Sequence, residues 1–278
     1  MYYLIQENLY SEKHHETLIH NLERMGLEYE LVKLIPFVNE IDFKTDRKDV
    51  FVFGAIKMAH IANTFGFVPG SMHNKNHDLE VYGPIYGQHM LNHGSHIMKF
   101  DSPLPEDKQW DMFFGRSCED DKAIPGQVFM RHSWNEYIEQ KLDGRKMFED
   151  ETQEAVDERM RLLRSKNVMI SPLKEIVREV RCWIVGGKVI TMSEYKIGRR
   201  VVYKNVDHED WLREIVQHFV DIYQPAEAFV MDVCEVFDEN FNNNGEVYIV
   251  EINCINCAGF YDGNTQLMLN ALEEHFNK

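Results

Sequence analysis

The stretches AFVMDVCEVF (228–237) and EVYIVEINCINCAGFYDGN (246–264) decide the fold, and the polar run NFNNNG lies between them. Both stretches are rich in apolar and β-branched residues, which favours strands. Asn and Gly tolerate positive φ, so the run between them is typical of a turn that reverses the chain. The sequence therefore predicts an antiparallel hairpin in the last quarter of the chain.

Three polar side chains interrupt this apolar hairpin. Because side chains alternate along a strand, Asp232 should lie on one face, and Glu251 should share a face with Asn253. The apolar residues assigned to the opposite faces are Phe229, Met231, Val233, Tyr248, Val250 and Ile252. Two carboxylates and an amide oxygen brought together suit Mg²⁺, which prefers hard oxygen ligands. The alternative is a half-exposed sheet with both carboxylates in solvent, and the pattern leaves both readings open.

The composition is that of a folded globular protein. Of the 278 residues, 44% are hydrophobic and 12% aromatic, which suffices for a large core. The net charge of −16 argues against a nucleic-acid backbone as the main partner, because such binding needs clustered cations. The apolar runs are too short for a membrane span, and five scattered cysteines fit a reducing compartment. We therefore expect a cytoplasmic protein that binds neither nucleic acid nor membrane.

The pattern of elements predicts an α/β chain with α+β lobes in three parts. Residues 1–105 form an N-terminal α/β lobe, with strands in YYLIQ, LEYELVKLIPF and DVFVFG and helices between and after them. The first helix begins at Ser11, buries Leu18, Leu22 and Met25, and ends at Gly26. Alternation of strand and helix favours parallel pairing. Residues 67–101 are expected to be loops with short helical pieces.

The second part, residues 106–175, is predicted to contain the strand DMFF, a polar loop, a return to apolar sequence at Val128 and a helix over 149–166. A strand in NVMISPLKEI, with Pro172 near its edge, follows. The third part, residues 176–278, opens with the hairpin IVREVRCWIV, Gly186-Gly187 and KVITMSEY. It continues with the helix HEDWLREIVQHFVDIY, the acidic hairpin and the helix NTQLMLNALEEHF.

Cations form a second set of candidates. Arg116 lies just after the predicted strand DMFF, and Lys122 follows in a loop that ends in Pro125-Gly126. A guanidinium and an ammonium beside such a loop suit phosphate oxygens. Taken alone, the pattern favours the alternative of two surface cations neutralised by Glu119, Asp120 and Asp121. Glu179 and Arg181 lie two apart on one strand and therefore share a face. They suit a ribose hydroxyl and a phosphate respectively, or form an ordinary cross-strand ion pair.

Two further patterns are set aside. Cys254 and Cys257 form C-x-x-C, but a zinc site needs four ligands and no second pair accompanies them. The histidines cluster in irregular stretches and are interpreted as solvated loop residues. Tyr195 and Lys196, beyond the predicted hairpin, are hypothesised to face a substrate.

The order of these elements resembles the ATP-grasp superfamily. More closely, the chain is similar to the divergent clade defined by two arginines and a lysine, which includes the eukaryotic cell-division-cycle protein that assembles translation initiation factor 2, and phage and bacterial members. The matching segments cover about residues 50–264: VFVFGAIKMAH, FVPGSM, MLNHG, FFGRSCEDDKAIPGQVF, EVRCWIVGGKVITMSEY, VMDV and VYIVEINCINCAGFYDGN. The chain departs from the clade pattern at Ser117, where Pro is expected, and at Cys257, where Ser or Pro is expected.

The resemblance implies a fold and a set of residue roles. An N-terminal lobe would precede two lobes that clasp ATP. Arg116, Lys122 and Arg181 would bind the phosphates, and Asp232, Glu251 and Asn253 would hold Mg²⁺. The remaining nucleotide contacts would be Glu179 at the ribose and the hinge residues Lys174, Glu175 and Ile176 at adenine.

The resemblance also implies a reaction. A substrate carboxylate would attack the γ-phosphate to give an acylphosphate and ADP, and an amine would then displace phosphate to form an amide or peptide bond. The carboxylate or amine could belong to a protein, and the compartment would be the host cytoplasm if a phage encodes the chain. Two alternatives share the site: an ATP-binding assembly factor without ligase turnover, and a kinase that phosphorylates a hydroxyl.

Overall fold

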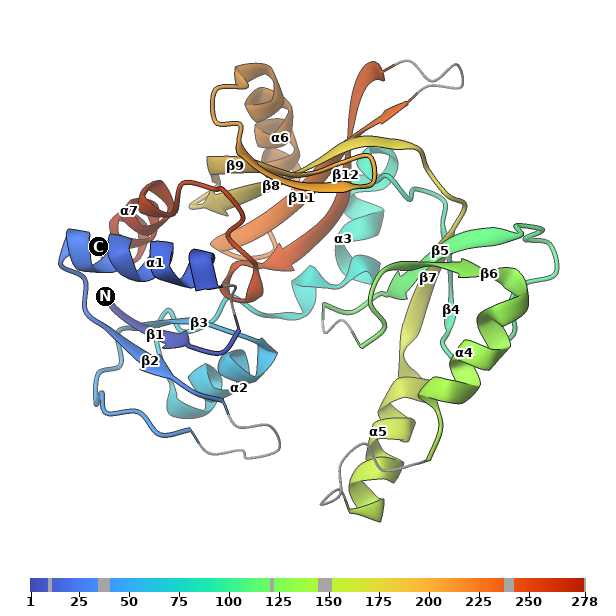
Figure 1. Cartoon of the computed structure of the whole chain (residues 1–278), viewed down its shortest axis with the longest axis horizontal. Helices are drawn as coiled ribbons and strands as arrows, with labels where there is room; N and C mark the ends of the chain where they lie inside the picture. The colour runs from blue at the N-terminus through green and yellow to red at the C-terminus, as the bar shows by residue number, and fades with distance from the viewer. Residues whose placement is uncertain (10–11, 35–40, 121–122, 145–151, 238–242, 278) are drawn as a thin grey trace. The chain divides into compact units, whose positions relative to one another are not determined.

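The computed structural model describes the 278-residue chain except residues 10–11, 35–40, 121–122, 145–151, 238–242 and 278 (Figure 1). The chain divides into two compact units. The large unit comprises Met1–His77, Val81–Leu91 and Glu175–Lys278, and the small unit comprises Asp78–Glu80 and Asn92–Lys174. The three-part division at residues 105 and 175 stays a prediction. No helix in the described ranges is both long and apolar enough to cross a membrane.

The large unit begins with a three-stranded parallel sheet, as the alternation of strand and helix predicted. Its order is β2-β1-β3, with β1 flanked by parallel partners on both sides. The elements are β1 (Tyr2–Gln6), α1 (Glu12–Met25), β2 (Tyr29–Val32), β3 (Val50–Phe53) and α2 (Ile56–Phe65). Leu18 and Leu22 of α1 are fully buried, and Gly26 ends the helix with a φ of 66°. Ser11, the predicted cap, lies outside the described residues.

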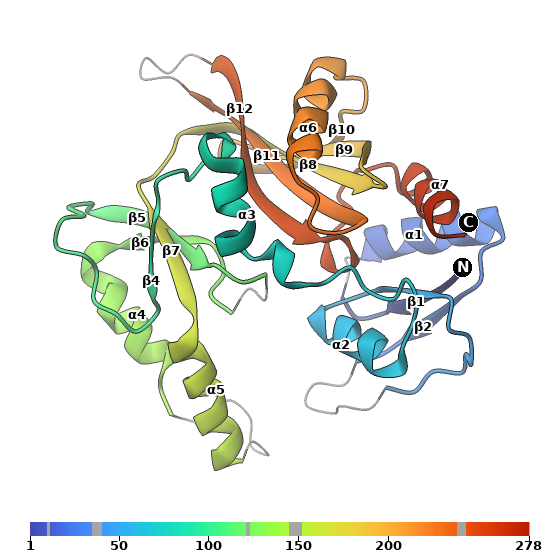
Figure 2. The same ribbon diagram turned by 180° about the vertical axis from the view of Figure 1, so that it is seen from behind.

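A five-stranded antiparallel sheet forms the rest of the frame of the large unit (Figure 2). Its order is β10-β9-β8-β11-β12. The strands are β8 (Ile176–Val185), β9 (Lys188–Ile197), β10 (Arg200–Asn205), β11 (Ala228–Phe237) and β12 (Asn243–Cys254). Both predicted hairpins are confirmed, and Gly186 and Gly187 supply the positive φ that the first turn needs. The edge strand β10 was not predicted.

A β-bulge interrupts the acidic hairpin beside the predicted site. Asp232 pairs with Glu251, but the next residue, Val233, pairs with Ile249. Val250 is therefore skipped, so Ile249 is fully buried while Val250 is only partly buried. The prediction that Tyr248, Val250 and Ile252 share a face was wrong, because it assumed unbroken alternation. Bulges often accompany functional sites, where they redirect side chains.

One hydrophobic core joins the N-terminal sheet to the C-terminal part of the chain. It contains Tyr3, Leu22 and Phe53 together with Trp183 and Leu269. Two further helices cover this unit, α6 (Asp210–Ile222) on the five-stranded sheet and α7 (Thr265–Phe276) beside α1 (Figure 1). The remaining elements of the region are η1 (Lys75–His77), α3 (Leu79–Tyr86), η2 (Gly87–His89) and η4 (Ile255–Cys257). Residues of the predicted N-terminal and C-terminal parts therefore pack together in one core.

The small unit is a four-stranded antiparallel sheet of order β4-β7-β5-β6. Its elements are β4 (His96–Lys99), β5 (Met112–Ser117), β6 (Gln127–Met130), η3 (Arg131–Ser133), α4 (Trp134–Lys141), α5 (Gln153–Ser165) and β7 (Asn167–Ser171). Phe113, Phe129, Ile170 and Trp134 form the core on one face of the sheet. Neither β4 nor α4 was predicted, and β5 extends past DMFF, so Arg116 lies within the strand and not after it.

We predict that His77 makes the stability of the fold pH-dependent. Its ring is 1% exposed, and burial lowers its pKa from 6.5 to about 4 despite a contact of 3.2 Å between Nδ1 and the Asn74 carbonyl. The neutral ring is favoured in the folded state, so its contribution is complete above pH 6.5. As the pH falls from 6.5 to about 4, the free energy of unfolding loses this contribution, which is roughly 3 kcal/mol.

Urea unfolding of the wild type and of His77→Gln at pH 7 and pH 4.5 tests this prediction. The variant should lose less free energy of unfolding on acidification than the wild type. His60→Gln, a change at an exposed histidine of α2, is the control and should leave the pH dependence as it is. Equal pH dependence in the wild type and His77→Gln would contradict the assignment.

Candidate functional site

The acidic residues predicted as metal ligands meet on one face of the five-stranded sheet. Asp232 lies on β11 directly between Arg181 of β8 and Glu251 of β12. Asp232 is 1% exposed, Asn253 is 4% exposed and Glu251 is half-buried. The alternative that Asp232 faces solvent is therefore wrong. A buried carboxylate needs a compensating partner.

Arg181 is that partner. Its Nε donates to Asp232 Oδ1 at 2.8 Å and its Nη2 donates to Oδ2 at 2.7 Å. Burial alone would lower the pKa of the Arg181 guanidinium, but the charge and hydrogen bonds of Asp232 outweigh burial and raise it. Each carboxylate oxygen has two lone-pair positions, and this fork uses one on each oxygen of Asp232.

Asn253 joins the two carboxylates. Its Nδ2 donates to Asp232 Oδ2 at 3.2 Å and to Glu251 Oε1 at 3.0 Å. The amide orientation follows from these acceptors, and a half turn about its last bond would present Oδ1 in place of Nδ2. The set can then offer a hard cation three protein oxygens, with phosphate and water completing the shell. The described residues contain no cluster of three His, Cys, Asp or Glu side chains that could hold a metal.

Glu179 and Arg181 share a face but do not pair with each other. Lys196, directly across from Glu179 on β9, forms an ion pair with Glu179 Oε1. The Tyr195 hydroxyl donates to Glu179 Oε2 at 2.6 Å. Glu179 is thus part of a cross-strand ion pair, with a partner that the sequence did not identify. Its carboxylate is held beside the Arg181–Asp232 pair.

Aromatic rings enclose the guanidinium of Arg181. It lies 4.8 Å from the ring centroid of Tyr261 and 5.7 Å from that of Tyr195, within the range of cation–π contacts. The two rings stack at 4.9 Å with an interplanar angle of 12°. Burial, Asp232 and Glu179 raise the pKa of Tyr195, so its hydroxyl is a neutral donor. The rings restrict Arg181 to the conformation that pairs with Asp232.

The predicted phosphate-binding cation Arg116 belongs to the small unit. It shares one face of β5 with Met112 and Phe114, and this face continues onto Val128 and Met130 of β6. Met112, Val128 and Met130 are 47%, 56% and 43% exposed, so this side of the sheet presents apolar surface next to a guanidinium. Lys122 lies outside the described residues.

The predicted hinge residues lie where the two units join along the chain. Lys174 ends the small unit and Glu175 begins the large one. The Glu175 carbonyl accepts the Phe237 backbone N–H at 3.0 Å, and Ile176 opens β8 opposite Val236. Glu175 and Ile176 are therefore joined to β11 in the sheet of the large unit.

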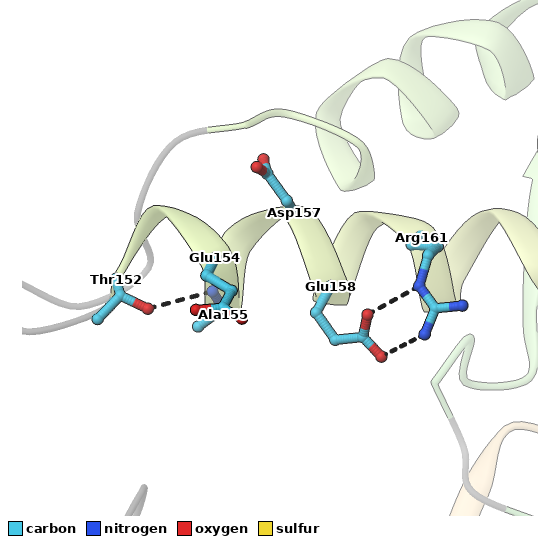
Figure 3. Close-up of a pocket in the computed structure, with 6 residues that line it drawn as sticks. All are labelled: Thr152, Glu154, Ala155, Asp157, Glu158 and Arg161. Atoms are coloured by element: carbon cyan, nitrogen blue, oxygen red, sulfur yellow. Dashed lines mark hydrogen bonds and ion pairs between the residues drawn. The ribbon is translucent and has the colours of Figure 1, made fainter.

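A shallow hollow runs along the first turns of α5 and contains none of the predicted residues (Figure 3). It is lined by Thr152, Glu154, Ala155, Asp157, Glu158 and Arg161. Its polar contacts are those of an ordinary helix start: Thr152 Oγ1 accepts the Ala155 N–H at 3.2 Å, and Glu158 pairs with Arg161 one turn later at 2.6 Å. We assign no ligand to it.

Asn256 is a residue whose role the sequence did not reveal. Its side chain is 1% exposed, and its Oδ1 accepts the Met72 N–H at 2.7 Å while its Nδ2 donates to the Val52 carbonyl at 2.6 Å. The Gly54 N–H donates to its backbone carbonyl at 2.8 Å. Asn256 thereby fastens the segment after Asn253 to the N-terminal sheet.

A second buried ion cluster lies on the opposite face of the sheet. Arg178 donates to Glu209 Oε2 at 2.6 Å and to Glu194 Oε2 at 3.2 Å, and it also pairs with Glu235. Hydrogen bonds to Glu209, then to the other two carboxylates, raise the pKa of Arg178 despite its partial burial. Its guanidinium lies 5.8 Å from the Trp211 ring on α6. This cluster attaches α6 to the sheet and is structural.

These features define a protein of the ATP-grasp class. Residues 114–272 match the model of the ATP-grasp domain of family 3 in the clade named for its two arginines and one lysine, so the chain belongs to that family. This match confirms the resemblance and the fold class that the sequence predicted. No curated protein sequence matches the chain.

Solved structures agree on the fold. The D-cycloserine synthetase DcsG is 11% identical with a TM-score of 0.58, and 99% of each chain is covered. The D-alanine–D-alanine ligase from Bacillus anthracis complexed with ATP is 13% identical with a TM-score of 0.55, covering 100% of this chain and 98% of that chain. The ATP-grasp ligase PsnB, complexed with minimal precursor, Mg and ADP, is 10% identical with a TM-score of 0.51, covering 100% and 98%.

We predict that Asn256→Ala destabilises the large unit by roughly 2–5 kcal/mol, because it leaves the Met72 N–H and the Val52 carbonyl buried without their partner. Urea unfolding at neutral pH measures this change. Asn270→Ala, at an exposed position of α7, is the matched control and should change stability by less than about 0.5 kcal/mol. A loss no larger for Asn256→Ala than for Asn270→Ala would refute the anchoring role.

Proposed function

We propose that the chain is an ADP-forming, Mg²⁺-dependent carboxylate–amine ligase that makes an amide or peptide bond through an acylphosphate. The observation that supports it is the convergence of Asp232, Glu251 and Asn253 on one sheet face beside a buried arginine. The ATP-grasp family assignment supplies the reaction class. Neighbours of the same fold are described as ligases or synthetases, and one is complexed with a precursor peptide. A protein or peptide substrate therefore fits the proposal.

In this proposal Asp232, Glu251 and Asn253 hold Mg²⁺. When bound, the ion supplies charge neutralisation at the phosphates of ATP. Arg181 has two tasks, since it orients Asp232 through the bidentate pair and adds positive charge beside the phosphates. Glu179, held by Tyr195 and Lys196, accepts a hydrogen bond from the ribose.

The small unit supplies the rest of the nucleotide contacts in this proposal. Arg116 and Lys122 neutralise phosphate oxygens. The apolar surface formed by Met112, Val128 and Met130 on the same sheet face as Arg116 suits a purine base. The segment Lys174 to Ile176 contacts adenine through its backbone.

The chemistry proceeds without a covalent protein intermediate. A substrate carboxylate oxygen bonds to the γ-phosphorus as the bond to the β,γ-bridging oxygen breaks, and ADP leaves. The amine nitrogen then bonds to the acyl carbon, inorganic phosphate leaves with the C–O bonding electrons, and the amine loses a proton. Burial raises the pKa of the Cys118 thiol to about 12, and it raises those of Cys182 and Cys234 further. These thiols stay protonated and are poor nucleophiles.

We predict that Glu251→Gln weakens binding of Mg·ATP at least about tenfold, because a neutral amide replaces a carboxylate ligand while Arg181 keeps its partner Asp232. Isothermal titration calorimetry with Mg·AMPPNP measures the affinity. Glu246→Gln, on the same strand but exposed, is the matched control and should bind as the wild type does. Wild-type affinity in Glu251→Gln would show that the Glu251 carboxylate is not a ligand of the proposed site.

A trapping assay separates the ligase from its alternatives. The protein is incubated with Mg·ATP, a panel of free amino acids and cell extract, and hydroxylamine. A ligase should release ADP together with a hydroxamate, because hydroxylamine intercepts the acylphosphate. A stable phosphorylated product would indicate a kinase, and nucleotide binding without ADP release would indicate an assembly factor.

A further inference from the structure

The β9–β10 hairpin carries a positive charge that contrasts with the rest of the chain. The segment YKIGRRVVYKN (195–205) contains four Lys or Arg residues and no Asp or Glu, although the whole chain has a net charge of −16. Lys196 is paired with Glu179. Arg199, Arg200 and Lys204 are exposed, and none of them forms an ion pair with a residue that the structure describes. The pKa of Glu209 is lowered mainly by Arg178, and the charges of His208 and Lys204 contribute less. This is an interaction at a distance and not an ion pair.

The same hairpin ends the five-stranded sheet. β10 is the edge strand, and β9 is its partner in the described sheet (Figure 2). An edge strand presents unpaired backbone N–H and C=O groups on its outer side, which can pair with an added strand. Cations along an edge discourage pairing with a neutral or basic strand, and they favour an acidic one.

The two faces of β10 differ in chemistry. Val201 pairs with Lys196 on the Glu179 face and is 69% exposed, and Tyr203 two residues later is 52% exposed. Arg200 and Lys204 pair with Ile197 and Glu194, on the opposite face. An added strand alternates its side chains between these two faces. It would therefore meet apolar surface on one side and exposed cations on the other.

The apolar face of β10 leads to the candidate site. Tyr203 stacks on Tyr261 at 5.7 Å and 20°, and Tyr261 in turn covers Arg181. Among the described non-glycine residues, Tyr261 alone has a positive φ, 46°, a strained conformation that persists only when its surroundings enforce it. The next residue is held to the hairpin, because the Asp262 N–H donates to Ser193 Oγ at 3.1 Å and Asp262 Oδ2 accepts the Asn205 N–H at 3.2 Å.

We propose that the outer edge of β10 binds an acidic, extended segment of a polypeptide substrate as an added strand. Acidic side chains of this segment alternate with apolar ones, the acids facing Arg200 and Lys204 and the apolar groups facing Val201 and Tyr203. The role of this segment as a substrate rests on the proposed ligase function, whereas its binding to β10 does not. Stacking of Tyr203 on Tyr261 connects the bound segment to the residues around Arg181.

Fluorescence anisotropy tests this proposal with a labelled peptide in which Glu and Val alternate, in the absence of nucleotide. The wild type should bind it at least about tenfold more tightly than a peptide of the same composition with Glu and Val in separate blocks. Arg200→Glu/Lys204→Glu, and separately Val201→Asp, should each weaken binding about tenfold or more. The control Lys75→Glu/Lys188→Glu makes the same charge change at exposed lysines and should bind as the wild type does.

Equal binding of the two peptides, or equal losses in the control double variant, would overturn the proposal. A loss of Mg·AMPPNP affinity in Arg200→Glu/Lys204→Glu would also overturn it, because these cations would then belong to the nucleotide site. A concentration-dependent dimer that this double variant abolishes would give the edge to a second copy of the chain. Peptide binding without ADP release would leave the edge site standing while the ligase assignment failed. Nucleotide binding and turnover without peptide binding would overturn the edge site while the ligase assignment stood.

Discussion

The bidentate pair between Arg181 and Asp232 is the constraint on which the candidate site depends. Two charges that are 6% and 1% exposed are tolerated only because each neutralises the other in good geometry. Removing one partner alone leaves an uncompensated buried charge, at a cost of about 3–5 kcal/mol. The pair therefore fixes the register of β8 against β11, and the bond from Asn253 to Asp232 joins β12 to them. The side chains proposed to hold Mg²⁺ are therefore ordered by contacts within the protein itself.

Around this pair the large unit supplies support from three directions. The rings of Tyr195 and Tyr261 restrict the guanidinium, and Lys196 holds the neighbouring Glu179. Asn256 ties the segment after β12 to the N-terminal sheet through backbone groups of Met72 and Val52. The N-terminal sheet is thus part of the frame of the site and shares a single core with the C-terminal strands.

Short-range patterns predicted most of the fold. Apolar periodicity and Gly or Asn turns located both hairpins of the large sheet, and strand alternation correctly placed Asp232, Glu251 and Asn253 on one face. The β-bulge at Val250 was missed, since no residue type announces it. The edge strand β10 was missed because none of its side chains is buried, so it lacks the alternation of buried and exposed residues that marks a core strand. The pairing of Glu179 with Lys196, and the core that joins the two ends of the chain, depend on contacts between distant residues that a local pattern does not contain.

The central claim is that this carboxylate–amide set on β11 and β12 binds the divalent cation of a nucleotide. The most direct measurement is electron paramagnetic resonance of Mn²⁺ titrated with the protein and AMPPNP, in the wild type and in Asp232→Leu/Arg181→Met, which removes both buried charges together. The account predicts that nucleotide-dependent loss of the free Mn²⁺ signal occurs in the wild type and disappears in the folded double variant. Undiminished binding of Mn²⁺ and nucleotide by that variant would contradict it.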